Sequence, residues 1–110
     1  MYAIKEGFKT INGEYVQTFQ RDVRGIETVL TVEAGTTGYT GGCSREGGSR
    51  TYLNLQCPTG DFYFKPVKDE KGKRIGFTIA CCGDDGLDAF MKAITFVRDA
   101  LNDQCLEIDD

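Results

Sequence analysis

The spacing of apolar residues changes once along this chain, and the change sets the expected fold class. Up to about residue 81, apolar side chains alternate with polar ones, which is the period of a half-buried β-strand. We therefore predict an α+β domain, with an antiparallel sheet of about six strands and one C-terminal helix packed on one face. The helix is predicted from apolar residues that recur every three or four positions: Leu87, Phe90, Met91, Ile94, Val97 and Leu101.

The strands are predicted from turn signals as well as from alternation. Asn12-Gly13 marks the first hairpin, because a type I′ turn needs positive φ at both central residues, and it places Phe8 opposite Gln17. Pro66 is expected to end a strand or to mark it as an edge. We expect a polar connection over residues 21–25 and later strands over residues 26–34, 50–57, 62–65 and 75–81.

The predicted helix has a clear beginning and a less clear end. Asp84 or Asp85 is expected to cap it, because acidic residues favour the positive end of the helix dipole. We expect it to end near Asn102, which leaves residues 105–110 as a short acidic tail. Its large apolar residues are expected to face the core.

Length and charge limit the class of protein. The 110 residues predict a single domain over residues 1–110. A net charge of −4 argues against direct nucleic-acid binding, which needs a dense basic surface. No apolar run approaches the ~20 residues that span a bilayer, and the N-terminus lacks a secretory pattern. The expectation is a cytoplasmic protein with no membrane partner.

Cysteine and histidine counts argue against metal binding and catalysis. Five cysteines without a framework spacing are interpreted as reduced thiols in a cytosol. There is no histidine, which removes a common zinc ligand and the commonest general base. We predict no metal, no cofactor and no catalytic residues.

The candidate binding site is a glycine-rich stretch. Six of the fourteen glycines lie within residues 35–50, but neither phosphate-loop nor dinucleotide spacing is present. Backbone N–H groups in such turns form anion-binding concavities, and arginines bind phosphate or carboxylate with two donors. The alternative is a plain connection between two strands, which also needs positive φ. The candidate ligand-binding residues are Thr36, Thr37, Tyr39, Arg45, Arg50 and Tyr52.

A second stretch, rich in lysine, has a simpler interpretation. Residues 65–74 carry four lysines and one arginine just after three aromatic residues, a combination found on platforms for single-stranded nucleic acid. Asp69 and Glu70 interrupt the run, and the whole chain is acidic. A solvated hairpin is therefore the favoured interpretation.

Two segments together resemble a known group of proteins. "GTTGYTGGCSREGGSRTYLNL" resembles the pattern GTTGxxGG…GGRTY, and "CCGDDGLDAFMKAITFVRDALNDQ" resembles the helix that follows it. The group consists of small, mostly uncharacterised proteins of phages and conjugative elements of Gram-positive bacteria, and the similarity covers residues 28–104. Cys43 and Glu46 stand where that pattern has Asp and His, and Ser49 is inserted before Arg50. The resemblance implies a protein that blocks host machinery or sequesters a defence signal.

Three functional hypotheses follow. The first is a non-catalytic phage protein that counters host defence, as an anti-CRISPR inhibitor does, by binding and blocking a host defence protein. The alternative is a sponge that sequesters a small nucleotide-like anion in the glycine-rich loop. A weaker alternative is a structural or regulatory module. The sheet face away from the helix carries fewer large apolar residues, so it is either wet or the surface of a homodimer.

Overall fold

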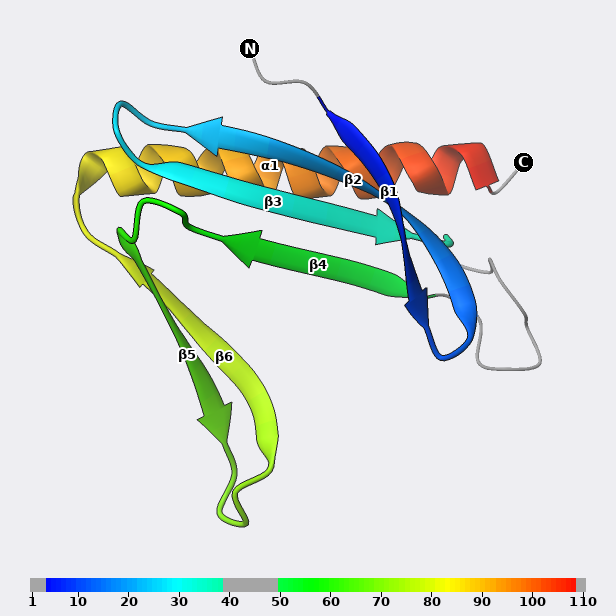
Figure 1. Cartoon of the computed structure of the whole chain (residues 1–110), viewed down its shortest axis with the longest axis horizontal. Helices are drawn as coiled ribbons and strands as arrows, with labels where there is room; N and C mark the ends of the chain where they lie inside the picture. Colours follow the sequence, from blue (N-terminus) through cyan, green and yellow to red (C-terminus); the bar gives the residue numbers. More distant parts are fainter. Residues whose placement is uncertain (1–3, 39–49, 109–110) are drawn as a thin grey trace.

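The computed structural model describes residues 4–38 and 50–108, and within them it has an α+β fold (Figure 1). The expected order of elements, with strands first and one helix last, is confirmed. The strands are β1 (Lys5–Ile11), β2 (Glu14–Arg24), β3 (Val29–Thr36), β4 (Thr51–Gln56), β5 (Phe62–Lys68) and β6 (Arg74–Cys81), and the helix is α1 (Gly83–Ile108).

The strands form two sheets, so the predicted single sheet of about six strands is wrong. One sheet has the order β1-β2-β3-β4 and the other is the β5-β6 hairpin, and every pairing is antiparallel. The turn after β4 separates them, because Gly60 has a φ of 78° and its N–H donates to the Cys57 carbonyl. Pro66 lies inside β5 and faces Phe77. Each strand of a two-stranded sheet is an edge strand, so the prediction that Pro66 marks an edge strand is confirmed.

The first hairpin forms as predicted, whereas the next connection is shorter than expected. Phe8 faces Gln17, and Asn12 and Gly13 both have positive φ. β2 continues to Arg24, so the predicted polar connection over residues 21–25 is wrong. The predicted strand at residues 26–34 begins only at Val29, because residues 26–28 turn their N–H groups toward α1.

α1 packs on β2 and β3 with small side chains. Ala89 and Ala93 are almost fully buried, and Phe96 completes the contact with Leu30 and Val32 of the sheet. The prediction that the large apolar residues of the helix all form the core is therefore wrong. Positions one or two residues from a sheet-facing alanine lie about 100° or 200° around the helix, so the sheet does not cover their side chains. Three of the predicted core residues are about half exposed: Leu87, Met91 and Ile94.

α1 is also longer than predicted. It continues to Ile108, past the expected end near Asn102, so most of the predicted tail is helical. Residues 87–108 contain no glycine or proline that would stop a helix. Gln104 is buried and bonded to the sheet, which holds the last turns in place.

The molecule is flat, with extents of 45 × 43 × 17 Å. Its radius of gyration is 15.5 Å, against about 13 Å for a compact domain of this length. The difference arises from the β5-β6 hairpin, here called the arm (residues 62–81), which projects from the four-stranded sheet (Figure 1). The lysine-rich turn lies at its exposed tip, which confirms the interpretation of residues 65–74 as a solvated hairpin.

Candidate functional site

The structure places four of the predicted binding residues around the point where the chain leaves β3 and returns to β4, here called the neck. Thr36 faces Thr51 in the β3–β4 ladder, and their hydroxyls are 3.0 Å apart. Thr37 and Arg50 exchange hydrogen bonds: the Thr37 N–H donates to the Arg50 carbonyl, and the Arg50 N–H donates to the Thr37 hydroxyl. These contacts fix the two ends of the glycine-rich connection.

Arg50 and Tyr52 are built into the neck more than they are presented to solvent. Arg50 is 7% exposed, and its Nε donates to the Ile11 carbonyl at 3.3 Å. Tyr52 is half-buried, with the Lys9 ammonium 5.7 Å from its ring centre. The other two predicted residues, Tyr39 and Arg45, lie outside the described residues.

A side-chain amide of α1 connects the neck to β2. The last pair of the β2–β3 ladder is Thr18 with Gly35, so the next position would pair Gln17 with Thr36. Gln104 occupies this position instead. Its Oε1 accepts from the Thr36 N–H at 3.0 Å, and its Nε2 donates to the Gln17 carbonyl at 2.8 Å.

The other end of α1 is attached to the sheet by a carboxylate. Asp85 accepts hydrogen bonds from the backbone N–H groups of Ile26, Glu27 and Thr28. Bonds from Glu27, then Ile26 and Thr28, lower the pKa of this carboxyl to about 2. A Cβ on Gly25 would overlap the Asp85 carboxylate, so glycine is required there. Asp84 and Asp85 both lie in the first turn of α1, which begins at Gly83. The Asp85 carboxylate binds the β2–β3 turn in place of the predicted role of a helix cap.

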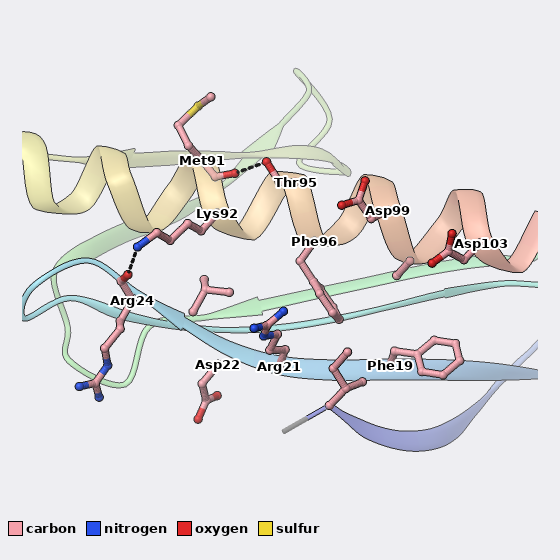
Figure 2. Close-up of a pocket in the computed structure, with 13 residues that line it drawn as sticks. Phe19, Arg21, Asp22, Arg24, Met91, Lys92, Thr95, Phe96, Asp99 and Asp103 are labelled. Carbon is pink, nitrogen blue, oxygen red and sulfur yellow. Dashed lines mark hydrogen bonds between the residues drawn. The ribbon is translucent and has the colours of Figure 1, made fainter. Parts of the chain in front are cut away.

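A concave site lies between β2 and α1 and is here called the groove (Figure 2). Its volume is about 800 Å³, which is in the range of ligand-binding clefts (roughly 300–1,000 Å³). Phe96 points from α1 toward β2 and forms part of its floor. The apolar residues that line it are Ile4, Phe19, Val23, Met91, Phe96 and Ala100.

Charged side chains of opposite sign stand on the two walls of the groove. On the β2 side the Arg21 guanidinium points toward α1, whereas Asp99 and Asp103 come from α1. Asp22 and Arg24 also border the groove, but their side chains point away from α1 (Figure 2). Lys92 closes one end, because its ammonium donates to the Arg24 carbonyl at 2.9 Å and lies 3.1 Å from Asp88. The groove therefore combines an apolar floor with one guanidinium on the β2 side and two carboxylates on the α1 side.

Thiol and metal chemistry have little support in the described residues. Burial alone would raise the pKa of the Cys57 thiol, but hydrogen bonds from Thr59 and from the N–H groups of Phe62, Asp61 and Gly60 lower it. Cys57 is a single thiol at the β4–β5 turn. In residues 4–38 and 50–108, no three cysteine, aspartate or glutamate side chains gather as metal ligands.

Sequence reasoning missed the groove residues. Arg21 and Arg24 fall in the predicted connection over residues 21–25, and nothing in the sequence around Asp99 marks it as a groove residue. The only available signal was the extent of alternation: Phe19, Arg21 and Val23 continue the period of two past the predicted strand end. That signal was enough to predict a longer β2, but it did not indicate that α1 lies beside this part of the strand.

Comparison of the chain with protein-family models, with curated proteins and with solved structures finds no match. In the part of the chain that the structure describes, no helix is long and apolar enough to cross a membrane. The fold and site thus define a two-layer α+β protein with a charged groove beside its helix.

Proposed function

We propose that this chain is a non-catalytic binding protein that takes a segment of a protein target into the groove between β2 and α1. The observation that supports this most is the groove itself, with its apolar floor, the Arg21 guanidinium on the β2 side and the Asp99 and Asp103 carboxylates on the α1 side. Such a site accepts an apolar anchor side chain and selects its neighbours by charge. The net charge of −4 favours a target segment with basic residues.

The backbone beside the groove supports an extended target segment. β1 pairs with β2 only as far as Gln20, whereas β2 continues to Arg24. Among residues 4–38 and 50–108, no strand pairs with residues 21–24 on the side away from β3. An added strand would bond to this edge and direct alternate side chains over the groove floor. Basic side chains of the segment would then face Asp99 and Asp103.

The resemblance to mobile-element proteins supports a host defence protein as the target. Blocking needs no chemistry beyond occupation of a surface that the target uses for its own partner. The nucleotide-sponge alternative would have to draw its contacts from residues 39–49, since Arg50 is 7% exposed and bonded within the neck. A thermal-shift screen against linear and cyclic nucleotides separates the two functions.

Selection of random displayed peptides on the immobilised full chain tests the proposal. We expect enrichment of peptides with an apolar residue next to lysine or arginine. Asp103→Lys should abolish their binding, because it reverses the charge of the acidic wall. Asp84→Lys is the matched control, since Asp84 is an exposed acid of the same helix outside the groove. The proposal fails if no motif is enriched, or if the two variants bind the peptides equally.

A further inference from the structure

The arm has one apolar face that this chain only partly covers. In the β5–β6 register Phe64 faces Ile79 and Pro66 faces Phe77, so these four side chains share one side of the hairpin. Near the body the face is anchored, because Ile79 packs against the core. Toward the tip it is bare, with Phe77 63% exposed. Such a face on a projecting hairpin is not stable alone in water without a partner surface.

β4 is an edge strand without the usual protection. Among residues 4–38 and 50–108 it has a strand neighbour on one side only, and its sequence, TYLNLQ, contains no charge and no proline. The opposite edge strand, β1, carries Lys5, Glu6 and Lys9. Natural edges are usually blocked by charges, prolines or a covering element, so β4 is expected to be covered. Leu53 of β4 is 52% exposed and lines, with Phe64 and Phe77, a hollow of about 410 Å³ between β4 and the arm.

One flank of α1 adds to the same surface. Phe90 packs against Phe62 of β5, with ring centres 6.1 Å apart, whereas Lys92 contacts the opposite neighbour, β2. Leu87 and Ile94 are three and four positions from Phe90, so they lie on the arm side of the helix. They are 54% and 48% exposed. The arm, β4 and this flank therefore form one uncovered apolar surface.

Charge identifies the partner that fits it. Residues 62–81 carry five basic and two acidic side chains, a net charge of +3. Since the whole chain has a net charge of −4, the remaining residues have a net charge of −7. A basic arm with an apolar face is complementary to the acidic, apolar body from which it projects. Its own chain cannot satisfy this complementarity, because the arm points away from the sheet (Figure 1).

We infer that two copies of this chain form a twofold dimer in which each arm lies against β4 and the α1 flank of the other copy. A twofold axis makes each contact twice, so a self-complementary surface suffices. The five exposed apolar side chains of this surface are Leu53, Phe64, Phe77, Leu87 and Ile94. They bring about 100 Å² each, or on the order of 500 Å² per copy before the β4 backbone and the polar rim are counted. A standard stable interface buries ~800 Å² per partner, so these side chains supply more than half of it. The groove lies on the other side of α1, so the dimer leaves both grooves accessible.

The test is the mass of the full chain in solution, measured by light scattering after gel filtration at about 100 μM, well above a micromolar dissociation constant. We expect a mass twice the 12.2 kDa of one chain. Phe77→Asp should give a monomer, because it places a charge at the centre of the apolar face. Tyr63→Asp is the matched control: Tyr63 is 59% exposed on the same hairpin but faces the other side. It should remain dimeric.

Circular dichroism establishes that each variant is folded. Phe64→Asp serves as a second disruption of the same face, because Phe64 is 40% exposed and lies opposite Ile79. Added salt should weaken the dimer, since the arm and body attract each other by charge. A monomeric wild type, including one whose arm binds a foreign protein instead, overturns the inference. So does dimerisation that persists in both Phe77→Asp and Phe64→Asp, or that is lost equally in Tyr63→Asp.

Discussion

Removing the Gln104 amide should destabilise the protein far more than an ordinary helix substitution. Gln104 is 5% exposed and bonds the Thr36 N–H and the Gln17 carbonyl, which would otherwise form the next position of the β2–β3 ladder. Gln104→Ala leaves both backbone groups buried without these partners. Each unsatisfied group costs roughly 1–3 kcal/mol, and partial closure of the ladder recovers some of this. We expect a loss of about 2–4 kcal/mol in the free energy of unfolding.

Urea unfolding followed by circular dichroism measures this loss, and a thermal scan should show a Tm lower by roughly 8–16 °C for a domain of this size. Asn102→Ala is the matched control, because it removes an exposed amide from the same helix two positions earlier. Its effect should stay within about 0.5 kcal/mol. Equal losses in the two variants would refute the argument that the Gln104 bonds connect helix and sheet.

A second substitution at the same position tests the direction of the hydrogen bonds. In Gln104→Glu an ionised carboxylate still accepts from the Thr36 N–H, but it faces the Gln17 carbonyl without a donor. The protonated acid restores that donor, so folding should raise the pKa of the introduced carboxyl. A raised folded-state pKa gives stability that is present at low pH and is lost as the pH rises. The difference in the free energy of unfolding between wild type and Gln104→Glu should therefore be smaller near pH 4 than at pH 7. A difference independent of pH would contradict the assigned donor and acceptor atoms of Gln104.

Two further predictions concern the Asp85 carboxylate, which binds the β2–β3 turn, and the neck. The pKa of Asp85 is lowered to about 2 in the folded state, so its contribution is present above its ordinary pKa of 3.8 and is lost as the pH falls through about 2. The difference in Tm between wild type and Asp85→Asn should thus be constant above about pH 5 and should become smaller in acid. A difference that stays constant down to about pH 2 would contradict the hydrogen bonds to this carboxylate. Arg50→Ala should lower the free energy of unfolding by about 1–3 kcal/mol, because Arg50 is 7% exposed and its Nε bonds the Ile11 carbonyl. Arg98→Ala, at an exposed position, is the control, and an unchanged Tm in Arg50→Ala would indicate that the guanidinium serves only a ligand.

The elements that local chemistry determines were predictable from sequence. Asn12-Gly13 permits a narrow set of turns, so the register of Phe8 with Gln17 followed directly. The helix also followed from its period. The sequence did not indicate which of the two apolar sides of that helix packs against the sheet. Ala89 and Ala93 are the closest to the sheet, yet the larger Leu87 and Ile94 carry the stronger apolar signal. Hydrophobicity alone therefore selected the wrong face.

The candidate site was less predictable, because its parts are distant in sequence. Arg21 on β2 and Asp103 on α1 are more than eighty residues apart, and each alone has the pattern of a solvated charge. The neck is the opposite case. Thr36, Thr37 and Arg50 were selected by their proximity to the glycines, and the structure does bring them together. Their side chains, however, bond mainly to one another and to the sheet.

The position of α1 links the two proposed surfaces. Because Ala89 and Ala93 face the sheet, Leu87 and Ile94 lie on the arm side of the helix, while Asp99 and Asp103 border the groove on the other side. A dimer formed through the arms covers the first surface and carries two copies of the second. Two linked sites bind a target with two matching segments more tightly than one site does, by a factor on the order of 10²–10⁴ when geometry permits. An acidic protein of this size would thereby gain in binding strength without enlarging either groove.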